Sequence, residues 1–312
     1  MIKTDFQHRR AMRIENDLLR VTVTVEGGHV AEIFDKSSGV NPLWIPPWPS
    51  IEVSSYSPEK YPEYGEGPER KLLGGIMGHN LCLSLFGPPS EAEQAAGLGS
   101  HGEAGLVAWD FASLPDGLIA SCTLPAAQLT FERRMRLEGN AILFEEQVQN
   151  HSPLDQPIAW TEHVTLGPPF LEYGRTQFRF PATNAQPLWP GYTAHLMDPR
   201  QNRAWFFARS PESEVCVGYV WDRTDFPWLG IWEENRGRTE APWNGRTVAR
   251  GMEFGVSPFP EPRKQMLERH KLFDTPCYRW IGAKGTLRAH YRAVIAKTSA
   301  IPETPEQFYS YV

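Results

Sequence analysis

The feature that most constrains the fold is a series of short runs in which apolar and polar residues alternate, spread over nearly all 312 residues. Alternation with a period of two places successive side chains on opposite faces of an extended strand. Clusters of Gly, Pro, Asn and Asp separate the runs and mark turns. The strands predicted in this way span residues 18–25, 29–34, 129–137, 141–150, 157–164, 214–219, 229–233, 252–256 and 286–295.

Helical periodicity is scarce, and only residues 90–96 and 303–311 predict short helices. The predicted strands are evenly distributed, and no Ser/Gly-rich or highly charged linker divides the chain. We therefore expect an all-β fold: one large antiparallel β-sandwich domain over residues 1–312 with few short helices.

The charge balance narrows the partners that we expect. The chain has 31 basic and 37 acidic residues and a formal net charge of −6. Long-range attraction therefore does not favour a polyanion such as nucleic acid. A small neutral substrate, or one held by a few local arginines, fits this composition better.

The cysteines and the N-terminus indicate a cytoplasmic protein. The cysteines lack the C-x-x-C spacing of zinc and redox sites, so we expect reduced core thiols. The first 20 residues are interrupted by charges, which leaves no apolar segment for export, and we expect no membrane association. The four cysteines are Cys82, Cys122, Cys216 and Cys277.

Three short segments carry side chains suited to acid–base chemistry. They are Ser-His-Gly-Glu at 100–103, Trp-Thr-Glu-His at 160–163 and Gly-Met-Glu-Phe at 251–254. In the second segment, alternation places Glu162 on one face of the strand and His163 on the other. Imidazoles and carboxylates are the usual general acids and bases of enzymes, so His101, His163 and Glu253 are our catalytic candidates.

Aromatic residues gather in two regions rich in proline or turn residues. Aromatic rings stack on the apolar faces of pyranoses, so these regions suit a carbohydrate cleft. The alternative is that most of these rings belong to the core. The residues are Trp44, Trp48, Tyr56, Tyr61 and Tyr64 in the first region and Trp221, Phe226, Trp228, Trp232 and Trp243 in the second.

The order of these segments resembles the galactose mutarotase-like family, whose type activity is aldose 1-epimerase. An arginine-bearing strand (Arg134 or Arg136), a strand closing on Val-Gln-Asn-His-Ser at 148–152 and then His163 reproduce the family's order. The His-Gly pair at 101–102 and the strand bearing Glu253 resemble two further family segments. The resemblance spans roughly residues 16–296 and implies the galactose mutarotase-like supersandwich.

The resemblance also implies a mechanism. Glu253 would take the proton of the anomeric hydroxyl while His163 protonates the ring oxygen, so that the sugar ring opens and recloses as the other anomer. His101 would bind and polarise the sugar. The resemblance implies neither a cofactor nor a resident metal.

Five further residues are expected to contact the substrate: His79, Glu103, Arg134, Asp222 and Trp232. Two segments, at 72–80 and 164–171, depart from the family's usual sugar-recognition segments, so the substrate need not be galactose or glucose. Arginines at 133, 134, 236, 238 and 246 leave a phosphorylated or acidic sugar open. The oligomer is expected to be a monomer or a homodimer.

Two other functions use the same residues. A non-catalytic carbohydrate-binding domain could have this fold, because one fold hosts many functions. Alternatively, imidazoles and carboxylates could converge on a divalent metal in a sugar-modifying enzyme. The candidate ligands for such a metal are His79, His101, Glu103, His163 and Glu253.

Overall fold

A computed structural model describes residues 1–311 and contains two large antiparallel sheets, which confirms the predicted all-β sandwich. The first sheet has eleven strands, and β20 pairs with β10 beside its main path. Its order is β1 (Ile2–Phe6), β2 (Arg9–Glu15), β3 (Leu19–Thr24), β4 (Val30–Asp35), β5 (His79–Ser84), β10 (Gln156–Leu166), β17 (Val248–Gly255), β16 (Trp228–Asn235), β13 (Tyr192–Met197) and β12 (Ala182–Trp189), with β20 at Arg279–Ile281.

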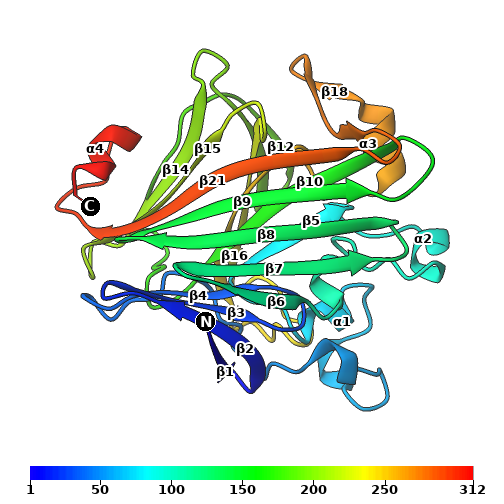
Figure 1. The fold of residues 1–312 in the computed structure, drawn as a ribbon, viewed down its shortest axis with the longest axis horizontal. Helices are drawn as coiled ribbons and strands as arrows, with labels where there is room; N and C mark the ends of the chain where they lie inside the picture. Colours follow the sequence, from blue (N-terminus) through cyan, green and yellow to red (C-terminus); the bar gives the residue numbers. More distant parts are fainter. Residues whose placement is uncertain (312) are drawn as a thin grey trace.

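The second sheet has eight strands, four of which lie side by side across the front of Figure 1. Its order is β11 (Gln177–Arg179), β14 (Arg203–Arg209), β15 (Val215–Asp222), β21 (Thr286–Lys297), β9 (Ala141–Asn150), β8 (Leu129–Glu138), β7 (Gly117–Leu124) and β6 (Asp110–Leu114). A separate two-stranded ribbon consists of β18 (Lys271–Leu272) and β19 (Thr275–Pro276).

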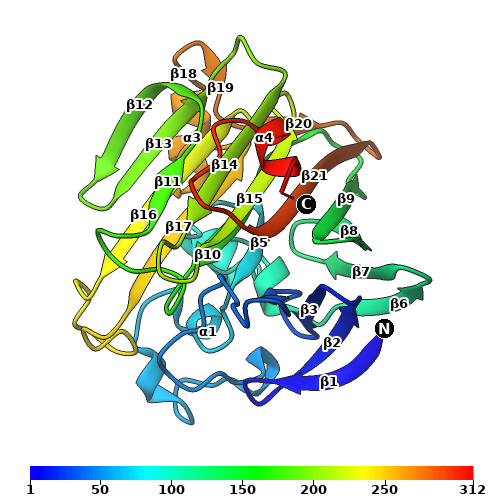
Figure 2. The same cartoon turned by 90° about the vertical axis from the view of Figure 1, so that its left-hand side faces the viewer.

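The helices are short. They are α1 (Arg70–Leu73), α2 (Glu91–Ala95), α3 (Arg263–Arg269) and α4 (Pro305–Tyr309), with 3-10 turns at Val53–Ser55, Pro62–Tyr64 and Ala104–Leu106. Ser90 and Glu93 form a reciprocal capping box that starts α2, as expected for this sequence pattern. Helix α4 packs Phe308 against Phe207 of β14, on the face of the second sheet that points away from the first (Figure 2). Within residues 1–311, no helix has the length and apolar character that crossing a membrane requires.

The main core lies between the two sheets and follows from the alternation within each strand. On β10, Trp160, Glu162 and Val164 point into this core, where Trp160 meets Phe131 of β8 edge-on at 6.2 Å between ring centroids. His163 and Thr165 therefore point to the opposite face of the first sheet. Alternate residues of β10 therefore point to opposite faces of the sheet, one set into the core and the other toward a surface where a site can form.

A buried ion network crosses this core. Arg133 of β8 donates to Glu146 of β9 (Nε to Oε1, 2.6 Å) and to Glu162 of β10 (Nη2 to Oε2, 2.5 Å), and all three side chains are fully buried. Tyr291 of β21 donates to Glu146 Oε1 at 2.7 Å, and His79 of β5 lies 2.8 Å from Glu162 Oε2. Buried charges persist only when they are paired and hydrogen-bonded, and this network therefore joins strands of both sheets.

Candidate functional site

The acid–base pair is formed by two neighbouring strands. β10 and β17 run antiparallel with His163 directly opposite Glu253, and both side chains lie on the face away from the main core. The His163 Nε2 atom lies 3.0 Å from Glu253 Oε1. The other ring nitrogen, Nδ1, lies 3.0 Å from the Thr165 hydroxyl, two residues along the same strand. The imidazole is thus held at both nitrogens, with its edge toward the carboxylate.

Two glycines leave room for the Glu253 carboxylate. Gly230 of β16 stands opposite Glu253 in the register, and a Cβ at this position would lie 2.1 Å from the Tyr192 hydroxyl and 3.4 Å from Glu253 Oε2. A Cβ on Gly251, two residues before Glu253, would lie 2.3 Å from its Oε1. Any residue larger than glycine at position 230 or 251 would therefore occupy space that the Glu253 carboxylate and its neighbours need.

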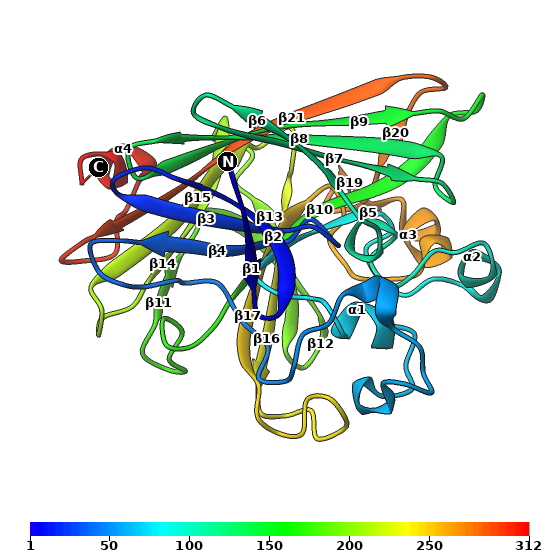
Figure 3. The ribbon, with the colours of Figure 1, turned by 60° about the horizontal axis from the view of Figure 1, so that its bottom comes forward.

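The pair lies at the wall of a cavity of about 350 Å³, a size at the lower end of the range for small-molecule sites. Aromatic residues from separate segments line it, among them Trp243, whose ring lies next to those of Trp44 and Trp232. Figure 3 shows α1 and the β16–β17 connection projecting from the first sheet on the side opposite the second sheet. Residues from both of these segments line the cavity, on the side that the pair faces.

His101 completes the polar part of the cavity. Its ring centroid lies 5.7 Å from that of His163, and Gly102, which follows it, approaches the Leu83 carbonyl so closely that a Cβ would lie 2.0 Å away. Burial, and then the charges of His163 and Arg238, lower the pKa of His101 to about 3. At neutral pH this imidazole is therefore uncharged, and it can take part in hydrogen bonds but cannot supply a charged acid.

Tyr192 of β13 was not singled out from the sequence, yet it lines the cavity next to Glu253. Its hydroxyl donates to the Pro258 carbonyl at 3.0 Å. Burial, followed by the Glu253 carboxylate, raises the pKa of this phenol well above its ordinary value, so the hydroxyl stays protonated.

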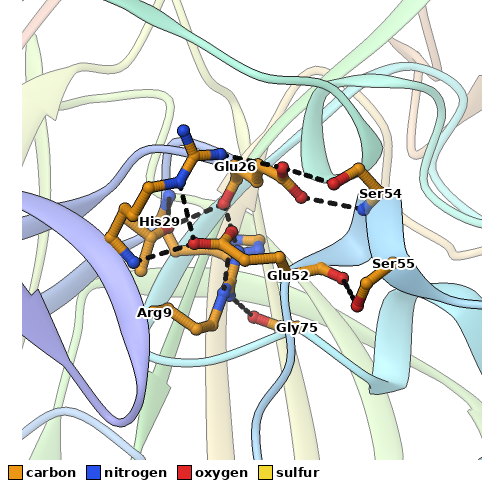
Figure 4. Close-up of polar contacts among 9 residues, drawn as sticks. Arg9, Glu26, His29, Glu52, Ser54, Ser55 and Gly75 are labelled. Atoms are coloured by element: carbon orange, nitrogen blue, oxygen red, sulfur yellow. Dashed lines mark hydrogen bonds and ion pairs between the residues drawn. The ribbon is translucent and has the colours of Figure 1, made fainter.

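Buried Arg9 fastens one wall of the cavity to the N-terminal hairpin (Figure 4). Its guanidinium donates to the carbonyls of Gly75 and Glu26, the second at 2.5 Å. The Glu26 carboxylate in turn accepts from the Ser54 backbone N–H at 2.8 Å and from the Ser54 hydroxyl at 2.6 Å. The segment between Ser54 and Gly75 contains α1, so these contacts hold the wall formed by Leu72 and Leu73 in place.

The structure brings four of the predicted site residues together at the cavity: His101, His163, Trp232 and Glu253. His79 lies elsewhere, although it is only one strand away. Its partner in the register is Val164, so it shares the core face with Glu162 and is fully buried. Burial lowers its pKa well below the ordinary value, and we leave this residue out of the proposed site.

Arg134, Glu103 and Asp222 also lie away from the cavity. Arg134 points outward from the second sheet and pairs with Glu132 at 2.9 Å; its neighbour Arg133 is the arginine that enters the core. The Glu103 carboxylate accepts the backbone N–H groups of the β7–β8 turn at Ala126 and Ala127, at 3.1 and 2.8 Å. Substrate contact is therefore not proposed for these residues.

Asp222 ends β15 at an exposed turn, where it accepts from the Thr224 backbone N–H and hydroxyl at 3.1 and 2.9 Å. It too is left out of the proposed site. The alternative of five residues converging on a divalent metal does not hold, because His79 faces the core and Glu103 caps a turn. Within residues 1–311, no three His, Cys, Asp or Glu side chains are grouped as a metal site would require.

Other cavity residues had sequence signals of differing strength. Thr165 lies two positions after His163, so strand parity alone places it on the same face. Trp44, Trp243 and Arg238 belong to the aromatic and arginine sets, but nothing in the sequence separates them from core and surface members of those sets. Leu72, Leu73 and Ile76 belong to the 72–80 stretch that stands in place of one of the resembled family's sugar-recognition segments, but their apolar side chains gave no signal of their own.

Comparison with solved structures decides the fold. A candidate aldose 1-epimerase from Klebsiella pneumoniae superposes with a TM-score of 0.69 at 16% identity, over 92% of this chain and 79% of that one. A galactose mutarotase-like protein from Clostridium acetobutylicum gives a TM-score of 0.65 at 11% identity, over 95% and 98% of the two chains. The chain has the galactose mutarotase-like fold.

Sequence comparison does not reach this conclusion by itself. No protein-family profile matches the chain, and no curated protein matches it in sequence. The galactose mutarotase-like fold is also seen in a galactose mutarotase related enzyme from Lactobacillus acidophilus, with a TM-score of 0.61 and 11% identity over 94% of this chain and 99% of that one. At such identities the likeness shows the fold, and activity has to be argued from the site.

Proposed function

We propose that the protein is a mutarotase, an isomerase of the aldose 1-epimerase type that interconverts the anomers of a sugar by opening and reclosing its ring. The observation that carries this proposal is the 3.0 Å contact between His163 and Glu253 at the wall of a tryptophan-lined cavity. A hemiacetal carbon bears both the hydroxyl oxygen and the ring oxygen. The base and the acid that serve these two oxygens must therefore lie close together, as these two side chains do.

In the proposed reaction, Glu253 as carboxylate accepts the proton of the anomeric hydroxyl. His163 as imidazolium gives its proton to the ring oxygen, the C1–O5 bond breaks and the C1–O1 bond becomes a carbonyl. Rotation about C1–C2 presents the other face of the aldehyde. Reclosure returns each proton to the group that gave it, so the reaction needs no other reactant.

The surrounding residues support these roles. The Thr165 hydroxyl at His163 Nδ1 fixes the ring orientation, and it can donate to a neutral imidazole or accept from an imidazolium. Neutral His101 is placed to bind a sugar oxygen beside the acid–base pair. The tryptophan rings supply apolar surfaces on which a pyranose can stack.

Saturation-transfer NMR tests the proposal by measuring anomer exchange directly on a panel of aldoses. We expect wild-type protein to accelerate exchange of at least one sugar, and His163→Ala and Glu253→Gln each to reduce that rate by about 10²- to 10⁴-fold. Matched controls are His151→Ala, at the exposed residue that follows β9, and Glu132→Gln, at a half-exposed residue of β8. Equal rates in all five proteins contradict the proposal.

The same samples separate catalysis from binding alone. Sugar-dependent changes in tryptophan fluorescence without any acceleration of exchange would assign the protein to the carbohydrate-binding alternative. The fluorescence arises in part from Trp44, Trp232 and Trp243 at the cavity, so ligand entry is expected to alter it.

A further inference from the structure

Most of the cavity wall beyond the acid–base pair is apolar. Leu72, Leu73 and Ile76 contribute from the α1 segment, and four tryptophans contribute from elsewhere. Glu69, Ser100 and Arg238 also line the cavity, but the side chains of Leu72, Leu73 and Ile76 present no polar group. Any hydroxyl directed at the α1 wall would lose its bonds to water without gaining partners in the protein.

Two of the hydroxyl groups near the pair are already engaged. The Tyr192 hydroxyl donates to the Pro258 carbonyl, and the Thr165 hydroxyl lies 3.0 Å from His163. These two hydroxyls hold the site in shape and are not free to pair with additional sugar hydroxyls. The arrangement favours a ligand with fewer hydroxyls than a common aldohexose.

The charges at the cavity also disfavour an anionic sugar. Among the cavity-lining residues of the described chain, Arg238 alone has a permanent positive charge. Its guanidinium lies 3.5 Å from Glu69 and 3.7 Å from Glu234, and its central carbon lies 4.5 Å from the centroid of the Trp243 ring. A phosphate or carboxylate would have to compete with two carboxylates for this one cation while also facing Glu253.

We propose that the cavity selects a neutral sugar that carries an apolar group away from its anomeric carbon, such as the methyl group of a 6-deoxyhexose, over its hydroxylated or phosphorylated counterpart. The inference rests on the site of the proposed mutarotase and names the class of its substrate. A methyl group in place of a hydroxymethyl group buries apolar surface against the α1 wall and removes one hydroxyl that the wall cannot pair.

Equilibrium binding to matched sugars tests this inference separately from catalysis. The probes are D-fucose against D-galactose, 6-deoxy-D-glucose against D-glucose, and the two corresponding hexose 6-phosphates. Binding is measured by tryptophan fluorescence and calorimetry on wild-type protein and on Glu253→Gln. We expect at least one 6-deoxy sugar to bind about tenfold or more tightly than its hydroxylated partner, and the phosphates to bind most weakly.

A wall variant checks that the preference arises where we place it. Ile76→Asn puts an amide into the cavity and is expected to reduce the preference severalfold. Leu188→Asn makes a comparable change at an exposed position of β12 outside the cavity, so the preference should persist.

Each outcome bears on one proposal or the other. Equal or tighter binding of the hydroxylated or phosphorylated sugars overturns the inference, as does the absence of binding by every sugar in the panel. Preference for the 6-deoxy sugar without anomer exchange keeps the inference and rejects the mutarotase. Anomer exchange without a preference for the 6-deoxy sugar keeps the mutarotase proposal and rejects the inference about its substrate.

Discussion

The buried network of Arg133, Glu146 and Glu162 predicts an unusual pattern of stability changes. Two carboxylates share one fully buried guanidinium. Burial, with repulsion from Glu162 adding to it and attraction by Arg133 opposing it, raises the pKa of Glu146 to about 8. At neutral pH the network therefore holds one arginine charge, one carboxylate charge and one proton on the second carboxyl group.

This charge balance makes either glutamate individually replaceable. In Glu146→Gln, the Glu162 carboxyl group remains beside Arg133, and in Glu162→Gln, Glu146 can lose its proton and take over as the counter-charge. Each single change is expected to cost about 1 kcal/mol, the value of an altered hydrogen bond. The double change leaves Arg133 buried without any counter-charge, at about 3–5 kcal/mol. The coupling between the two positions is therefore about 2 kcal/mol.

Urea unfolding of the wild type, both single variants and the double variant measures these costs, if the slopes of the unfolding curves stay equal. The pH dependence is a second readout. Because the pKa of Glu146 is higher in the folded protein than in the unfolded chain, its contribution to stability is full below about pH 4.5 and is lost as the pH rises through about 8. In Glu146→Gln, this loss of stability near pH 8 should not occur, because glutamine does not titrate. Additive costs, or an unchanged pH profile, would refute the shared proton.

Three further predictions follow from the site and its supports. Gly251→Ala is expected to reduce anomer exchange at least tenfold, because the new Cβ would lie 2.3 Å from Glu253 Oε1 and 3.2 Å from the Trp232 Cβ and would displace the carboxylate. Arg9→Met should weaken sugar binding about tenfold, measured by fluorescence, because the α1 wall loses its anchor. The free energy of unfolding should decrease as the pH falls below about 6.5, because two buried histidines become protonated in the unfolded chain but stay neutral in the folded protein. Burial lowers the pKa of His29 well below its usual value and that of His101 to about 3. For His101, this lowers the free energy of unfolding at pH 5 by about 1–2 kcal/mol, which urea unfolding measures.

Matched controls accompany these predictions. Gly282→Ala places a Cβ no closer than 3.8 Å to its nearest neighbour and should leave exchange unchanged. Arg10→Met removes a mostly exposed guanidinium from the same cluster as Arg9 and should leave sugar binding intact. Equal effects of target and control changes would contradict the roles given to Gly251 and Arg9, and a stability that does not fall below pH 6.5 would contradict neutral buried histidines.

Strand parity was the most informative sequence signal. It predicted strand 141–150 with the bounds that β9 has, and it predicted opposite faces for Glu162 and His163, as β10 has them. The same signal missed several strands, among them β1, β2, β6, β7 and β12–β14, and it also missed β5, which lies next to β10. On this strand His79, Leu81 and Leu83 face the core while Asn80 and Cys82 face away, and a histidine in the core pattern disguises the alternation.

The errors at the candidate site residues arise from long-range partners. Arg133 and Arg134 are adjacent arginines, and only the pairing of β8 with β9 shows that the first enters the core and the second does not. Glu103 is a turn cap because Ala126 and Ala127 approach it from a distant segment. Such contacts have no local sequence signature. The single-domain prediction for residues 1–312 stays a prediction.

The most direct measurement of the central claim is anomer exchange in a double-mutant cycle of His163→Gln and Glu253→Gln. If the two side chains transfer protons in one concerted unit, the double variant should exchange anomers no more slowly than the slower single variant, since either change alone disables the unit. Two losses that multiply, or a wild type without exchange on any sugar that it binds, would contradict the account.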